Sequence, residues 1–109
     1  MGICIVRLAN YKLNTEISSF REFENYNLSI LGRRSGNLYT ITHWGTKVLE
    51  YDLSKNEIVY LYETHYSQTT SALVGRVLRS LPKSAVAVFI EKLDSKPKQR
   101  RFLRMLGVL

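Results

Sequence analysis

Residue types that build metal sites, disulfides and membrane spans are scarce in this sequence. Its single cysteine, Cys4, cannot form an internal disulfide, and one cysteine with two histidines falls short of a structural zinc site. No apolar run approaches the roughly 18 residues that a membrane span needs. We therefore predict no metal, no cofactor and no membrane partner, and a location in a reducing compartment, the cytoplasm.

Linkers and repeats are also missing. No proline- or glycine-rich tract and no internal repeat interrupts the 109 residues. A chain of this length holds one hydrophobic core, and 45% apolar residues can fill it. The 23% of charged residues is typical of an ordered globular protein. The sequence thus predicts a single domain over residues 1–109.

Acidic residues are few in the last third of the chain. Residues 1–72 carry seven basic and seven acidic side chains, whereas residues 73–109 carry nine basic and two acidic ones. The whole net charge of +7 therefore falls in the last third. Such asymmetry is typical of a surface for phosphate-rich partners, and a solvated charged face is the alternative interpretation.

The centre of the chain is rich in β-branched and aromatic residues, which predicts strands. Short joints separate the apolar segments there, and joints this short force neighbouring strands to be antiparallel. A homodimer through an exposed edge bearing Tyr60 and Tyr62 is a further prediction. The expected elements are a strand at 3–8, a helix at 16–25, a break at 32–37, and strands around 28–31, 38–44, 47–53 and 57–62.

Past residue 66 the apolar residues take the spacing of helices. Residues 73–81 follow it and stop at Pro82, and residues 95–105 begin with a Ser-x-Pro helix start. The β-branched run at 84–93 favours a strand, although Ser84 as a cap leaves a helix open. The predicted fold class is α+β: an antiparallel meander of three or four strands with helices packed on one face and basic C-terminal helices.

Basic side chains fall along one edge of each of the two C-terminal helices. Arginine predominates, and its planar fork suits bidentate contacts with phosphate. A second phosphate clamp could form in the glycine-flanked turn around 33–34, where two solvated arginines at a hairpin tip are the simpler interpretation. The predicted nucleic-acid-binding residues are Arg76, Arg79, Lys83, Lys98, Arg100, Arg101 and Arg104, with Arg33 and Arg34 as the second group.

The two histidines, His43 and His65, are the remaining candidates for chemistry. Two histidines on neighbouring strands near arginines could in principle cleave RNA by general acid–base catalysis. No carboxylate at a telling spacing would orient either ring, so no catalytic residue is assigned. A small ribonuclease is therefore the third hypothesis, and a binding protein is favoured over an enzyme.

The block at residues 39–71 has a distinctive skeleton. An aromatic strand leads to Trp44–Thr46, an apolar strand ends at Tyr51–Asp52, and a further strand leads to Tyr66–Ser71. This block resembles a family of small uncharacterised proteins encoded mainly by bacteriophages, in which an aromatic-Ser-x-Thr-Thr-Ser segment follows a Gly-Thr hairpin. A histidine commonly follows that segment where Leu73 stands here, which argues against a ligand role for this position. The resemblance implies a phage or mobile-element origin and assigns no site residue.

Charge and resemblance together put two hypotheses ahead of the ribonuclease. The first is a small phage or mobile-element accessory protein that binds nucleic acid or a ribonucleoprotein through its C-terminal helices. The second is a phage-encoded inhibitor of a host bacterial protein complex such as an immune nuclease, an anti-CRISPR-like anti-defence protein. The first requires affinity for bare nucleic acid that falls with salt, and the second a stable complex with one host assembly.

Overall fold

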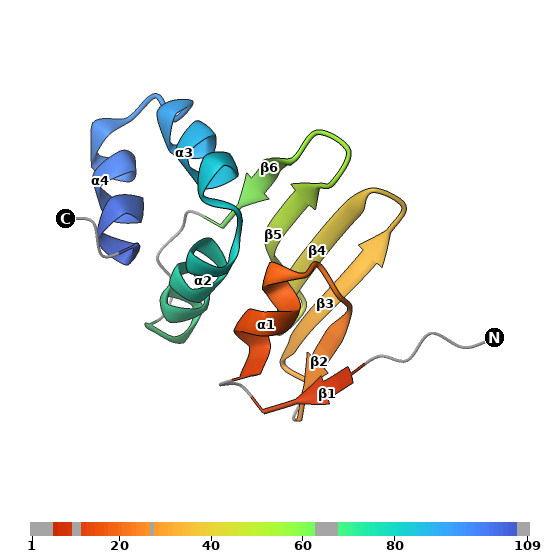
Figure 1. Cartoon of the computed structure of the whole chain (residues 1–109). Helices are drawn as coiled ribbons and strands as arrows, with labels where there is room; N and C mark the ends of the chain where they lie inside the picture. Colours follow the sequence, from red (N-terminus) through yellow and green to blue (C-terminus); the bar gives the residue numbers. More distant parts are fainter. Residues whose placement is uncertain (1–5, 10–11, 27, 63–67, 107–109) are drawn as a thin grey trace.

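The computed structural model describes residues 6–9, 12–26, 28–62 and 68–106 of the chain (Figure 1). The described residues form one β-sheet and a set of α-helices. The elements are β1 (Val6–Leu8), α1 (Leu13–Ser18), β2 (Phe23–Asn25), β3 (Ile30–Ser35), β4 (Leu38–His43), β5 (Thr46–Asp52), β6 (Glu57–Leu61), α2 (Gln68–Ser80), α3 (Lys83–Glu91) and α4 (Lys96–Met105).

The sheet has its strands in chain order, from β1 at one edge to β6 at the other. Strands β2 to β6 form an antiparallel meander, and β1 pairs with β2 in parallel. Helix α1 lies in the connection between these two strands, because a parallel pair needs a crossover. The predicted α+β class is confirmed, with more strands than the three or four expected.

The helices lie on the side of the sheet shown at the left of Figure 1. Helix α1 packs against β2 and α2, α2 also contacts β5, and α3 packs against β6. Helix α4 contacts α2 and α3 and lies outermost, away from the strands. No helix in the described part of the chain is long and apolar enough to cross a membrane.

The core forms where the covered face of the sheet meets the helices. The register aligns Tyr39 with Tyr51 and Ile41 with Leu49, so these side chains share one face and are fully buried. Burial of large apolar side chains is the main term that stabilises such a layer. The helices contribute the fully or almost fully buried residues Leu13, Ile17, Val74, Val77, Leu78 and Phe102.

The helix expected at 16–25 is wrong in its position, because the chain turns out of α1 early. Phe20 has a left-handed φ of 54°, and its N–H donates to the carbonyl oxygen of Ile17 over 3.1 Å. The next N–H donates to the carbonyl oxygen of Glu16 over 3.0 Å, which completes a Schellman termination. Glycine usually occupies the left-handed position of this motif, so phenylalanine there gives no signal in the sequence. Strand β2 then begins at Phe23.

The strand favoured for residues 84–93 is also wrong, since α3 occupies this segment. The helix starts directly after Pro82, which stands at the N-cap with a φ of −56° and an extended ψ of 132°. Val86 and Ile90 lie four residues apart and are both buried. Their burial outweighs the modest cost of β-branched residues in a helix, so the alternative of a helix is correct. Ser84 is not its cap, because Pro82 stands at the N-cap and Ser84 is the second residue of the helix.

A bulge in β6 puts Tyr60 on the face opposite Ile58, and Tyr62 follows the last residue of this strand. Glu50 pairs with Tyr60, whereas Tyr51 pairs with Ile58, so Val59 is an extra residue in this strand. Tyr60 is 40% exposed, but Tyr62 is only 7% exposed. The exposed edge with both tyrosines is therefore wrong, and a homodimer stays a prediction without that support.

The buried Tyr39 should make the stability depend on pH in alkali. Its hydroxyl donates to the carbonyl oxygen of Arg21 over 2.7 Å. Burial, and less strongly the charges of Glu16 and Glu22, raises the pKa of Tyr39 well above its usual 10. In the unfolded chain this phenol ionises near pH 10, whereas the folded state keeps it neutral. The free energy of unfolding should therefore be unaffected below pH 10 and fall above it, by up to about 1.4 kcal/mol per pH unit.

Urea denaturation between pH 8 and 12 measures this effect. Tyr39→Phe should show a shallower decline above pH 10, after a loss of about 1 kcal/mol at pH 8 for the missing hydrogen bond. Tyr60→Phe is the control, because its exposed side chain should leave the slope unchanged. An equal alkaline slope in Tyr39→Phe and the parent protein would contradict the prediction.

Candidate anion-binding site

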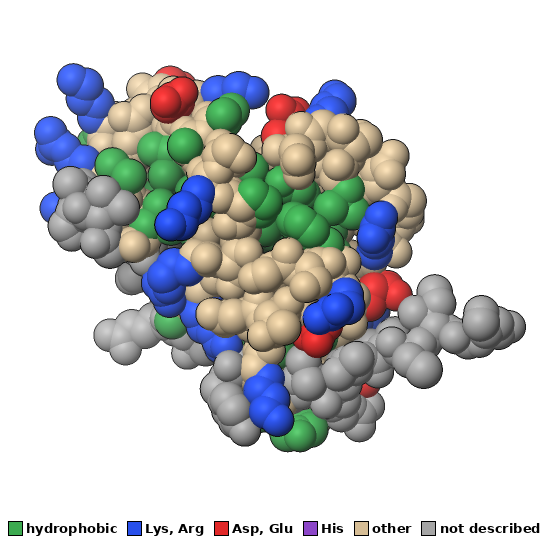
Figure 2. Space-filling view, viewed as in Figure 1, with side chains coloured by type: hydrophobic (Ala, Val, Ile, Leu, Met, Phe, Trp, Pro, Cys, Tyr) green, Lys and Arg blue, Asp and Glu red, His purple; other side chains and the backbone are tan. Residues whose placement is uncertain are grey.

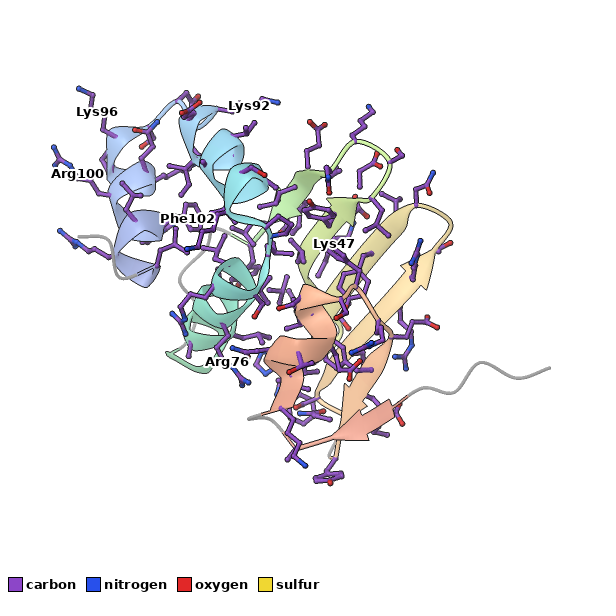
Figure 3. The ribbon with its side chains drawn as sticks, viewed as in Figure 1. Lys47, Arg76, Lys92, Lys96, Arg100 and Phe102 are labelled. Atoms are coloured by element: carbon purple, nitrogen blue, oxygen red, sulfur yellow. The ribbon has the colours of Figure 1, made fainter. Side chains whose placement is uncertain are left out.

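Helix α4 carries a straight row of cations. Lys96, Arg100 and Arg104 recur every fourth residue, so they lie on one side of the helix about 6 Å apart along its axis. All three are exposed. Figure 3 shows Lys96 and Arg100 directed away from the body of the protein. We call Lys96, Arg100 and Arg104 the outer row.

The opposite side of α4 fixes the orientation of the outer row. Phe102 is fully buried and meets Phe89 edge to face, with ring centroids 5.8 Å apart. The side-chain amide of Gln99 donates to the carbonyl oxygens of Ile90 and Leu93, over 3.1 and 2.9 Å. These carbonyls lie at the end of α3, where a helix leaves acceptors unsatisfied. Packing and capping together keep the outer row facing solvent.

Two further predicted cations of α4, Lys98 and Arg101, lie beside the row and are half-buried. The Arg101 guanidinium lies 5.6 Å from the centroid of the Phe102 ring. Both residues make further interactions within the protein. They add positive charge next to the outer row, but their side chains are less accessible to a partner than those of the row.

On α2, Arg76 has a structural contact. Its Nε and Nη2 both donate to the side-chain oxygen of Asn14, over 3.1 and 2.9 Å, and so join α2 to α1. Burial, and then the charge of Arg79, lowers the pKa of Arg76. Arg79 and Lys83 are exposed and both line a groove beside α4. Arg79 and Lys83 therefore lie nearer to α4 than Arg76 does.

The second predicted group, Arg33 and Arg34, does not join the first. Both residues lie on β3, and the chain turns only at Gly36, so the expected hairpin tip is wrong. Arg33 donates to the carbonyl oxygens of Phe23 and Gly32 over 2.9 and 3.0 Å. Figure 1 places the turn between β3 and β4 at the opposite end of the molecule from α4. The structure therefore separates these arginines from the basic helices.

The sequence prediction left out two cations of the C-terminal part. Lys96 belongs to the outer row, and its four-residue spacing to Arg100 and Arg104 was a signal that could have found it. Lys92 lies 3.8 Å from a carboxylate oxygen of Glu57. A pair this exposed contributes little to stability but lowers the local positive charge.

Residues with the chemistry for catalysis or base stacking are mostly out of reach. His43 is 7% exposed on the covered face of the sheet, and burial lowers its pKa. His65 lies outside the described residues. Tyr39 and Tyr51 are fully buried, whereas Trp44, in the turn before β5, is 70% exposed. Within the described ranges no three His, Cys, Asp or Glu side chains gather closely enough to hold a metal ion.

Comparison of the chain with protein-family models, with curated proteins and with solved structures finds no match in any of the three. The phage-family resemblance of residues 39–71 therefore stays a prediction. The candidate site rests on the geometry of α2, α3 and α4 alone.

Proposed function

We propose that this protein binds nucleic acid, bare or within a ribonucleoprotein, through the outer row of α4. The observation that carries the proposal is the row itself: three exposed cations, evenly spaced on one side of a helix. None of the three forms an ion pair with a residue that the structure describes. A phosphate backbone is a polyanion that such a row can follow, with arginine supplying paired donors.

The surroundings of the outer row favour a phosphate-rich partner. Figure 2 shows Lys and Arg side chains around α4 and the end of α2, with few acidic side chains between them. A solvated surface normally mixes both signs, which keeps its potential low. An unbalanced cluster instead attracts anions and speeds their association. The phage or mobile-element origin proposed from residues 39–71 would place this binding in the cytoplasm of a bacterial host.

Charge reversal in the outer row tests the proposal. Fluorescence anisotropy with short single- and double-stranded DNA and RNA should give micromolar affinity at about 50 mM salt. Three phosphate contacts predict a loss in affinity of about 40-fold between about 50 and 200 mM salt. The double variant Arg100→Glu/Arg104→Glu should bind at least about tenfold more weakly at low salt. Its remaining salt dependence should be only about threefold, because two contacts are gone.

The control variant is Lys47→Glu/Lys55→Glu, which makes the same change in net charge. Both residues are exposed, Lys47 near the start of β5 and Lys55 in the turn between β5 and β6. Figure 3 shows Lys47 on the sheet, away from α4. This control should keep most of the affinity. Equal losses in both double variants would show that only net charge matters, and no binding at low salt would refute the proposal in favour of the host-inhibitor hypothesis.

A further inference from the structure

A groove lies between α3 and α4, beside the end of α2. Its volume is about 560 Å³. Its aliphatic walls come from Val86, Ala87, Ile90, Leu103 and Leu106, and Arg79 and Lys83 complete the described lining. Figure 2 shows hydrophobic side chains gathered over α3 and α4 with Lys and Arg side chains beside them. The groove is therefore apolar along most of its surface, with two cations in its lining.

The lining residues of α3 follow one another along the axis of this helix. Lys83, Val86 and Ile90 lie on one side of α3, from its first residue to its eighth, a length of about 10 Å. Arg79, in the last turn of α2, lies near the same end of the groove as Lys83. The first turn of α3 adds the partial positive charge of a helix N-terminus there. One end of the groove is thus cationic, and the rest is aliphatic.

The chemistry of the lining selects a class of ligand. Among the described residues that line the groove there is no aromatic side chain to stack a nucleobase and no neutral side chain to hydrogen-bond a sugar or base. Aliphatic walls remove an alkyl chain from water at a gain of about 0.8 kcal/mol per buried methylene. Two adjacent cations favour a negative group at one end of that chain.

The size of the groove favours a small molecule over a protein. Pockets for small ligands measure about 300–1,000 Å³, a range that includes this groove. A standard protein interface instead takes about 20–30 residues from each side. We propose that the groove binds a single-chain aliphatic carboxylate, with its alkyl chain along Val86, Ile90 and Leu103 and its carboxylate at Arg79 and Lys83. This site goes beyond the nucleic-acid proposal, which rests on other cations.

Titration with decanoate, followed by methyl NMR and calorimetry, tests the proposal without any nucleic acid. Saturable shifts are expected for the methyl groups of Val86, Ile90 and Leu103. Decyltrimethylammonium has the same alkyl chain with a positive head, and it should bind at least tenfold more weakly. Equal affinity for both amphiphiles, or no shift with decanoate, would overturn the proposal.

A substitution inside the groove gives the second arm of the test. Ala87 lines the groove and is exposed, so Ala87→Glu should fold normally. The new carboxylate, four residues after Lys83, should pair with it and repel the ligand, so we expect decanoate affinity to fall at least tenfold. Val88→Glu adds the same charge about 100° further round α3, and it should bind decanoate as the parent does. Unchanged affinity in Ala87→Glu would place decanoate elsewhere.

Discussion

Replacing Phe102 by alanine is expected to reduce the free energy of unfolding by about 3–5 kcal/mol. Phe102 is the one residue of α4, among those described, whose side chain is fully buried. Its ring fills the space between the C-terminal helices and meets Phe89 edge to face. Truncation removes this burial and leaves a cavity that the helices can close only by moving.

Urea denaturation followed by circular dichroism measures this loss, and hydrogen exchange locates it. Amides of α4 should exchange faster than those of the central strands, because α4 contacts helices and no strand extensively. Phe102→Leu keeps most of the buried volume and should cost less than about 1.5 kcal/mol. A loss below about 1 kcal/mol in Phe102→Ala would show that α4 is not anchored by this side chain.

The second large effect is expected from Gly32→Ala, which should reduce the free energy of unfolding by about 3 kcal/mol. A Cβ atom added to Gly32 would lie against Cε1 of Phe23 and only 2.6 Å from its Cδ1. It would also lie 3.0 Å from the hydroxyl oxygen of Tyr39. Both rings are fully buried, so neither can move aside without disturbing the covered face of the sheet.

Gly36→Ala separates this steric effect from a general preference for glycine. Gly36 has a left-handed φ of 59°, but nothing lies within 4 Å of an added Cβ. Backbone strain alone should therefore cost about 1 kcal/mol. Thermal denaturation of both variants gives the comparison, and a Gly32→Ala cost no larger than that of Gly36→Ala would rule out the predicted clash.

The sequence predicted the antiparallel centre of the fold well, because short joints and β-branched segments constrain neighbouring strands directly. It failed where one backbone angle or one long-range contact decides the outcome. Phe20 ends α1 with a left-handed φ that phenylalanine rarely adopts. The helix at α3 depends on burial of Val86 and Ile90 against the rest of the protein, which local propensity does not contain.

The candidate site was predicted in outline, because charge on helices is visible in the sequence. The sequence did not predict which of its cations are exposed and which are engaged within the protein, because this depends on contacts between residues that are distant in the sequence. Arg76 is bound to Asn14, a residue 62 positions away. The groove could not be predicted, because its α3 wall exists only if residues 83–91 form a helix.

The agreement between strand order and chain order has a consequence for synthesis on the ribosome. Every pairing from β2 to β6 joins neighbours, so little loop entropy opposes these contacts as each strand emerges. The meander is complete at Leu61, before α2, α3 and α4 have been made. For a period on the order of seconds the nascent chain then presents an apolar face that α1 alone covers in part. The helices that carry the basic surface are also the last to protect this chain from aggregation.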